Sequence, residues 1–205
     1  MRGAIALFAT CLTSGAQVPT ETDGLLRVEA ENFDRQELTQ VREWRVVSAG
    51  AHAEGASGGA YIEVLPDTRT SHDDKLIRGE NFTNEPGVMA VVAYDVRITS
   101  PGRYFVWVRA YSTGTEDNGI HVGIDGEWPE SGRRMQWCEG KNAWTWASKQ
   151  RTADQHCGVP GLIWLDIAEP GSHTVMFSMR EDGFEMDAWV LSSDPAFSPE
   201  APSAR

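Results

Sequence analysis

Two distant segments carry carboxylates whose spacing suits metal binding. The early segment LLRVEAENF holds Glu29 and Glu31, which share one face if the segment is an extended strand. Two carboxylates this close repel each other unless a cation or an arginine lies between them. Asp187, in the late segment FEMDAW, joins them if the first and last strands are neighbours. The cluster predicts a Ca²⁺ site completed by backbone carbonyls, with a solvated acidic edge or an ion pair to Arg27 as the alternative.

The segment 126–157 holds four of the eight tryptophans, interleaved with basic and amide side chains. Sugars stack their C–H faces on indole rings and hydrogen-bond to amides, carboxylates and guanidinium groups. We therefore predict that these residues contact a sugar ligand: Trp128, Trp137, Trp144, Trp146, Arg134 and Asn142. Packing in the core is the alternative for each tryptophan, and Trp144 and Trp146 face the same way if the chain there is extended. The tryptophans inside predicted strands are expected in the core: Trp107, Trp164 and Trp189.

The N-terminus resembles a secretory signal peptide. A basic start, an apolar stretch over residues 3–12 and small residues before Ala16 predict cleavage after residue 16 and a secreted or periplasmic protein. A frayed tail of an internal fragment is the alternative. Cleavage removes Cys11 and leaves Cys138 and Cys157, which predict one disulfide. A zinc site formed by these cysteines and His156 would have only three ligands without typical spacing.

Further polar groups lie near predicted turns. Candidate sugar contacts at loop ends, which turn chemistry alone also explains, are Asp117, Asn118, Arg180 and Glu185. His72 lies beside two aspartates, an arrangement that suits a metal, an acid–base site or a solvated turn.

Alternation of apolar and polar residues predicts strands separated by Gly, Pro and Asp turns. The expected strands cover residues 94–99, 103–111, 120–124, 162–167, 173–179 and 186–190. They predict an all-β, two-sheet jelly-roll sandwich over residues 25–193, with a long Trp-rich loop insertion. Residues 17–24 are expected to be a linker, and residues 194–205 a tail or linker.

Composition narrows the classes of partner. The chain has 205 residues, of which 40% are hydrophobic and 23% charged, and its net charge is −12. This charge argues against nucleic acid as the main partner, and an anionic polymer would need a local basic patch. No apolar run approaches the ~18 residues of a membrane span.

Four motifs in order resemble the carbohydrate-binding modules of families 6 and 35, over residues 25–193. They are VEAENF, GASGGAYI (55–62), SPGRY (100–104) and GFEMDAW (183–189). The resemblance implies a jelly roll with a structural calcium ion, and its ligands map onto Glu29, Glu31 and Asp187. Those modules often carry a sugar-binding Asn where this chain has Glu185, so the usual sugar contact is altered.

Three functions compete at this point. The first is non-catalytic polysaccharide binding that targets or assists an appended or co-secreted polysaccharide-degrading enzyme. The second is a glycoside hydrolase or polysaccharide lyase on the same sandwich, for which the unpaired candidates are His72, Asp73, Glu139 and His156. The third is an adhesion or structural domain stiffened by calcium.

Overall fold

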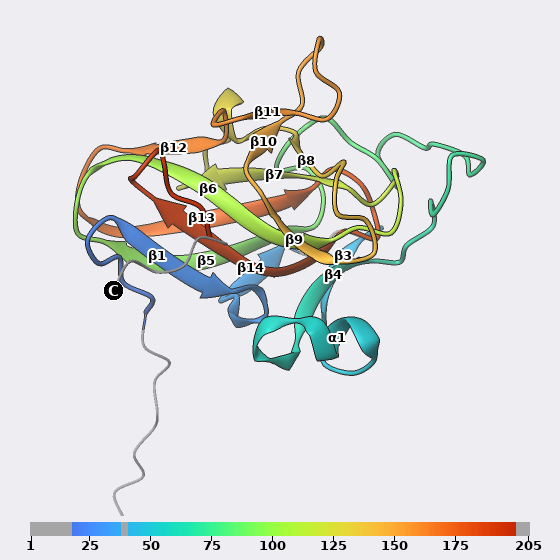
Figure 1. The fold of residues 1–205 in the computed structure, drawn as a ribbon, viewed down its shortest axis with the longest axis horizontal. Helices are drawn as coiled ribbons and strands as arrows, with labels where there is room; N and C mark the ends of the chain where they lie inside the picture. Colours follow the sequence, from blue (N-terminus) through green and yellow to red (C-terminus); the bar gives the residue numbers. More distant parts are fainter. Residues whose placement is uncertain (1–17, 38–40, 200–205) are drawn as a thin grey trace, which may run out of the picture.

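A computed structural model describes residues 18–37 and 41–199, so the predicted signal peptide lies outside the described residues. Two antiparallel sheets pack face to face (Figure 1), as the alternation predicted. The first sheet has the order β12 (Trp164–Ile167), β6 (Gly102–Tyr111), β14 (Glu185–Ser192), β4 (Tyr61–Leu65) and β3 (Glu43–Val47), with β1 (Leu25–Glu29) beside β14 and β9 (Trp144–Ala147) beside β6. The second has the order β11 (Val159–Pro160), β10 (Lys149–Gln150), β8 (Met135–Gln136), β7 (Gly119–Ile124), β13 (Gly171–Met179), β5 (Val91–Ile98) and β2 (Arg35–Glu37).

Helical structure in the described chain is short. The helix α1 (Ala51–Gly55) lies below β4 at one edge of the sandwich (Figure 1). Three 3₁₀ turns cover Ala30–Asn32, Ser57–Gly59 and Glu130–Gly132. No helix within residues 18–37 and 41–199 is long and apolar enough to span a membrane.

The core lies between the sheets and is rich in aromatic residues. Tyr94 contacts the edges of Trp189 and Phe177, with ring centroids 5.2 and 6.0 Å apart. The expectation that Trp189 is a core residue is confirmed, because it is fully buried. Trp107 and Trp164 were also expected in the core, but they are only half-buried. Their inward neighbours are buried, so alternation turns these two half-buried indoles to the outer face of the first sheet.

Two local expectations need correction. The first strand ends at Glu29, and Ala30–Asn32 forms a 3₁₀ turn, so Glu29 and Glu31 do not share a strand face. The Trp-rich insertion is not one long loop, because it contributes β8, β9 and β10 to the two sheets. Backbone hydrogen bonding to distant strands decides both outcomes, and a local pattern does not reveal it.

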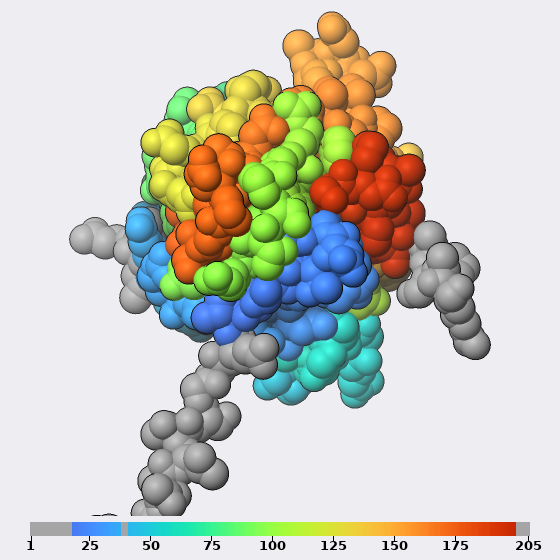
Figure 2. Space-filling model, turned by 90° about the vertical axis from the view of Figure 1, so that its left-hand side faces the viewer, coloured from blue at the N-terminus to red at the C-terminus, as the bar shows by residue number. Residues whose placement is uncertain are grey.

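Residues 18–24, expected within a linker, are hydrogen-bonded to the sandwich. Arg97 N–H donates to the Pro19 carbonyl at 2.9 Å, and Glu21 N–H donates to the Arg97 carbonyl at 2.8 Å. The buried Glu21 carboxylate accepts from Thr99 N–H at 2.8 Å. Further along, Ser193 N–H donates to the Gly24 carbonyl, so the N-terminal segment (blue) and the C-terminal segment (red) lie side by side (Figure 2).

The predicted disulfide is present. Cys138 and Cys157 are bonded, with their Cα atoms 5.3 Å apart. The bond excludes both sulfurs as thiolate ligands, which removes the zinc alternative. It joins the start of the connection to β9 with the loop before β11, which projects from the molecule (Figure 1).

We expect the double variant Cys138→Ser/Cys157→Ser to lose about 3 kcal/mol of unfolding free energy, because the bridge restricts a loop of ~20 residues in the unfolded chain. Urea unfolding of both proteins, with and without reductant, measures the loss. Reductant is expected to destabilise the parent and leave the variant unchanged. Equal stability of parent and variant under oxidising conditions would contradict the prediction.

Candidate functional site

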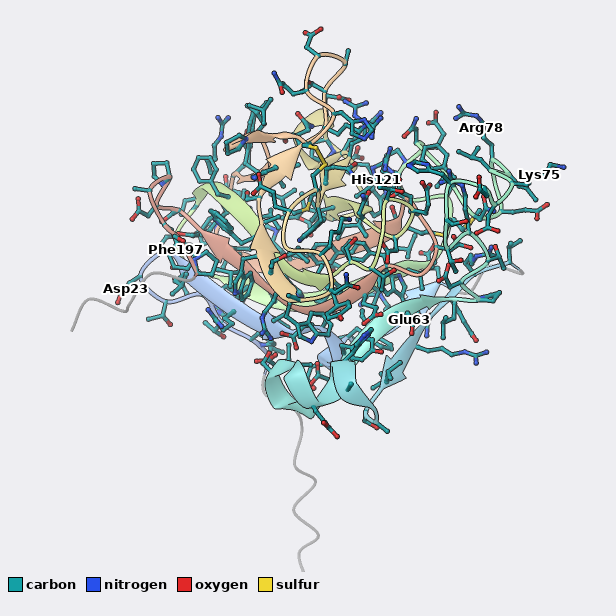
Figure 3. All side chains as sticks on the ribbon, turned by 45° about the vertical axis from the view of Figure 1, so that its right-hand side comes forward. Asp23, Glu63, Lys75, Arg78, His121 and Phe197 are labelled. Atoms are coloured by element: carbon teal, nitrogen blue, oxygen red, sulfur yellow. A yellow bond between two sulfur atoms is a disulfide. The ribbon has the colours of Figure 1, made fainter. Side chains whose placement is uncertain are left out.

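An aromatic and acidic cluster lies on the outer face of the first sheet, where β4, β6, β9 and β14 meet beside α1. We call it the aromatic–acidic site, and its members are His52, Tyr61, Glu63, Tyr111, Trp144 and Glu185. Strand register assembles it: Glu185 lies opposite both Glu63 and Tyr111, and Tyr111 lies opposite Trp144. Figure 3 shows Glu63 beside α1 at the lower edge of the sandwich. Side chains from four strands and one helix therefore converge on one patch.

The rings of this site are held against one another. His52 stacks on Tyr111 with centroids 3.9 Å apart, and Trp144 meets the Tyr111 and Tyr61 rings edge-on at 5.5 and 5.3 Å. The Trp144 indole N–H donates to the His52 carbonyl at 2.9 Å. A Cβ on Gly55 would lie 3.2 Å from the same indole, so a glycine there allows α1 to approach closely. Contacts on several sides hold the half-buried Trp144 in place before any ligand binds.

The carboxyl groups of the site retain protons at unusually high pH. Burial, together with the charge on Asp117, raises the pKa of Glu185 to about 8. Burial and the charge on Glu185 raise the pKa of Glu63 to about 7. Glu185 also lies 2.9 Å from His52 Nδ1. Near neutral pH these groups can both donate and accept hydrogen bonds, which suits them to sugar hydroxyls.

Of the expected ligand contacts, Trp144 and Glu185 lie in this site, and Trp146 follows on the same strand. Trp146 is half-buried on the outer face, with the Arg27 guanidinium 5.2 Å from its ring centroid. The expectation that both indoles face the same way is met because β9 is extended.

The other two tryptophans of the segment lie elsewhere. Trp137 is 2% exposed and packs on Phe184 in the core, so its indole has no face free for a ligand. Trp128 covers the second sheet, where a Cβ on Gly123 or Gly87 would collide with its ring. The four tryptophans do not form one surface, because the segment that carries them runs through both sheets.

The expected polar contacts are also dispersed. Asp117 is buried and accepts from Thr113 N–H at 2.7 Å and Ser112 Oγ at 2.7 Å, which stabilises the loop after β6. Asn118 is buried against Gln136, and Arg180 is buried in an ion pair with Glu181. Arg134 pairs with Glu130, and the exposed Asn142 has a backbone N–H bond to Ser112. None of these five belongs to the aromatic–acidic site.

The three expected calcium ligands converge near the turn Ser57–Gly59. Ser57 Oγ donates to Glu29 Oε2 at 2.5 Å and lies 3.0 Å from Asp187 Oδ2. Burial raises the pKa of Glu31, and the charges on Glu29 and Asp187 raise it further.

Two observations bear on whether the carboxylates of Glu29, Glu31 and Asp187 could hold a metal ion. Oε2 of Glu31 is buried without a hydrogen-bond partner, and Arg109 Nη1 neutralises Asp187 at 2.5 Å. Within the described residues, no group of three His, Cys, Asp or Glu side chains is arranged to hold a metal ion as it stands.

Sequence reasoning did not identify His52, Tyr61, Glu63 or Tyr111 as site residues. Tyr61 and Glu63 lie two residues apart on β4, and Tyr111 lies at the end of the alternating strand β6. The alternation therefore could have predicted that each of these side chains points to the outer face of its strand. The sequence could not predict that these side chains lie together, because their proximity depends on the pairing of β4 and β6 with β14.

Comparison with known proteins places this fold among carbohydrate-related domains. Residues 20–196 match the family described as the glycosyl hydrolase family 115 C-terminal domain. An uncharacterised protein, P23, from Formosa agariphila is 56% identical over 190 residues, which cover 87% of this chain. The chain spans about half (46%) of the length of that relative.

Solved structures share the fold at low sequence identity. A family 35 carbohydrate-binding module from Paenibacillus barcinonensis matches with a TM-score of 0.50 and 12% identity, over 82% of this chain and 98% of the module. A Podospora anserina β-(1,4)-mannanase that carries a family 35 module matches with a TM-score of 0.51 and 14% identity, over 87% of this chain and 29% of the enzyme. These matches confirm the fold that the sequence motifs suggested.

The raised pKa values of Glu63 and Glu185 predict a pH dependence of stability. The folded protein keeps both protons where the unfolded chain, with carboxyl pKa values near 4.5, has released them. Their contribution to stability is fully present below about pH 4.5 and is lost as the pH rises through about 7 and about 8. We expect the parent to lose stability relative to Glu63→Gln/Glu185→Gln across this range.

Thermal melts at about pH 5 and about pH 9 measure this difference. Glu139→Gln, which removes an exposed carboxylate, is the control and should follow the parent at both pH values. Parallel pH profiles for the parent and the double variant would show that the two carboxyls titrate normally.

Proposed function

Because the chain belongs to the family of glycosyl hydrolase family 115 C-terminal domains, we propose that it is a non-catalytic module that binds a polysaccharide. The observation that carries the proposal is the ring cluster of His52, Tyr111 and Trp144 beside Glu63 and Glu185. Indole and phenol rings offer stacking faces, and the neighbouring carboxyls offer donors and acceptors for hydroxyls. The solved fold of a family 35 carbohydrate-binding module supports the same substrate class.

The site is suited to recognition because its groups are ordered before binding. Trp144 is held by the His52 carbonyl, and His52 is held by Tyr111 and Glu185. A sugar that stacks there therefore costs little side-chain entropy. An energetically significant contact is expected from the part of Trp144 that remains exposed.

The module is proposed to assist a polysaccharide-degrading catalytic domain, either appended or co-secreted. The matched family is by its description a C-terminal domain of a glycosyl hydrolase, and the relative P23 is about twice as long as the matched region. Attachment would raise the local concentration of the catalytic domain at its substrate. The Cys138–Cys157 disulfide supports a location outside the cytoplasm, in the periplasm or medium.

We also propose that Glu29, Glu31 and Asp187 hold a structural Ca²⁺ ion. Hard oxygen ligands suit this ion, and the buried, unpartnered Oε2 of Glu31 is an oxygen that such an ion could coordinate. A Cβ on Gly58 would lie 2.9 Å from Glu31 Oε1, so the carboxylate and the turn backbone approach closely. The ion would join β1 to β14 and the Ser57–Gly59 turn, and it would not contact the sugar.

A hydrolase remains the second candidate, and the raised pKa values of Glu63 and Glu185 favour it. A carboxyl that keeps its proton near neutral pH can act as a general acid. However, the two residues are direct cross-strand neighbours on one sheet face, whereas glycosidase carboxyls flank the scissile bond. Release of reducing ends from a polysaccharide panel would identify this activity.

We expect Trp144→Ala to weaken binding to the preferred polysaccharide by about 5- to 150-fold, equivalent to ~1–3 kcal/mol, because it removes a stacking face. A glycan array selects the ligand, and calorimetry measures affinity. Trp128→Ala, on the second sheet, is the matched control and should bind like the parent. Unchanged affinity of a folded Trp144→Ala protein would place the binding site elsewhere.

Chelation of calcium is expected to lower the melting temperature, and added Ca²⁺ should restore it, because an ion that binds only the folded state stabilises it by mass action. Glu31→Gln should abolish the response, while the exposed Glu139→Gln should retain it. Absence of metal in elemental analysis, together with a melt unaffected by chelator, would refute the calcium proposal.

A further inference from the structure

A pocket of about 400 Å³ opens between the two sheets, at the end of the sandwich away from the aromatic–acidic site. It lies where β7 and β12 end and β13 begins, beside the 3₁₀ turn Glu130–Gly132. Strand β6 starts opposite Ile167 of this pocket and ends at Tyr111 of the aromatic–acidic site. Its ten residues span about 30 Å, so the two sites lie at opposite ends of the first sheet. We call this cavity the end pocket.

The floor of the end pocket is apolar. It is formed by the side chains of Ile124, Pro129, Ile167 and Ala168. Ile124 and Ile167 belong to the core between the sheets and are 9% and 3% exposed. Pro129 is half-buried and Ala168 is exposed, so apolar surface continues from the core to the outside of the molecule. An apolar hollow that opens to solvent is typical of a surface that a partner covers.

Four carboxylates surround this floor, whereas its lining contains no lysine or arginine. Two of the four are paired within the module. Asp166 pairs with Arg103 Nε at 2.8 Å, and Asp125 Oδ2 lies 2.7 Å from His173 Nδ1. Burial of His173 favours the neutral ring, but the hydrogen bond to Asp125 outweighs burial and raises the pKa of His173. The raised pKa favours an imidazolium that balances the charge on Asp125.

The other two carboxylates, of Glu127 and Glu169, are exposed and have no ion-pair or side-chain hydrogen-bond partner among the described residues. Two uncompensated negative charges at the rim of an apolar hollow favour a cation. A lysine or arginine offers that cation on an aliphatic stem, which buries along apolar surface. A volume of about 400 Å³ leaves room for an apolar side chain beside the stem. The end pocket therefore matches a polypeptide segment with basic and apolar residues.

The described chain enters and leaves the module at this same end. The Pro19 carbonyl accepts from Arg97 N–H at 2.9 Å, and the next residue of β5 lies opposite Gly171, beside the bend that holds Glu169. Figure 2 looks onto this end, where the N-terminal segment (blue), the C-terminal segment (red) and the segment around β12 (orange) share one face. A domain joined at either end of the described chain therefore lies within reach of the end pocket.

From these observations we propose that the end pocket is a docking site for a basic and apolar segment of the catalytic domain joined to the module. The proposal rests on the proposed function in taking that domain as attached, and it adds the surface on which the two domains meet. The relative P23 extends over about twice the matched length, which is where such a segment would lie. Docking at this end leaves the aromatic–acidic site free to hold polysaccharide.

Short peptides test the chemistry of the end pocket on the chain as it exists. The probe Ac-Leu-Arg-Leu-NH₂ carries both the charge and the apolar side chains. Ac-Leu-Gln-Leu-NH₂ lacks the charge, and Ac-Gly-Arg-Gly-NH₂ lacks the apolar side chains. In NMR titrations we expect the first peptide to bind at least about fivefold more tightly than either of the others and to shift the methyl signals of Ile124 and Ile167.

Glu127→Gln/Glu169→Gln is expected to reduce the affinity for Ac-Leu-Arg-Leu-NH₂ to that of the uncharged peptide. Its melting temperature should equal that of the parent, because both side chains are exposed and unpaired. Glu80→Gln/Glu139→Gln makes the same change in charge at exposed positions outside the pocket, and it should bind the peptide like the parent.

The source of the docking segment is tested with overlapping peptides that tile the part of P23 outside the matched region. At least one peptide with basic and apolar residues is expected to bind the parent and to lose affinity for Glu127→Gln/Glu169→Gln. If no peptide from P23 distinguishes the parent from this variant, the assignment to the attached domain is wrong.

Equal binding of the three short peptides, or equal effects of the two double variants, overturns the docking site. The outcome is independent of sugar binding. A chain that binds a polysaccharide through Trp144 but none of the peptides keeps the proposed function and refutes docking. A chain that shows the expected peptide pattern but binds no glycan on the array keeps the docking site and loses the proposed function.

Discussion

The pairing of β14 along both of its edges is the constraint on which the rest of the structure depends. One edge pairs with β6, and the other pairs with β4 at its start and with β1 further along. Its inward side chains, among them Met186, Trp189 and Leu191, are fully buried in the core. Its outward side chains supply Glu185 to the aromatic–acidic site and Asp187 to the carboxylate cluster. A strand so enclosed cannot shift register without exposing core residues.

A local irregularity in this strand separates the two outward groups. The register with β6 shifts between Met186 and Ala188, so Asp187 is left out of the β6 ladder. Its carboxylate then accepts a hydrogen bond from Ser57 N–H at 2.8 Å and forms an ion pair with the Arg109 guanidinium. Since Glu185 is only two residues away, β14 connects the carboxylate cluster directly to the aromatic–acidic site. A structural ion there would act on recognition through the position of β14 and not through contact.

The molecule separates its charges over a short distance. Carboxyls gather near β4 and β14, where burial and mutual repulsion raise the pKa values of Glu63, Asp67 and Glu185. Arginines gather beyond Glu116 around a pocket, where Arg69 and Arg180 are paired with Glu116 and Glu181. Both groupings place ionisable side chains where burial and like charges disfavour their charged forms. The overall charge of −12 conceals this division, because net charge carries no information on position.

The amino-acid sequence by itself determined the class of fold, most of the long strands and the disulfide. Period-two alternation is a local property of β5, β6, β7, β13 and β14. With Cys11 assigned to the expected signal peptide, Cys138 and Cys157 were left as the one possible pair. It also singled out Glu29, Glu31 and Asp187, which do converge. Only the tertiary structure decided that Trp144 lies against Tyr61 and Tyr111 while Trp137 is buried, and that Glu63 faces Glu185. Alternation states that a side chain points to one face or the other, but the neighbours on that face come from strands distant in the chain, and their register is set by the packing of the whole sandwich.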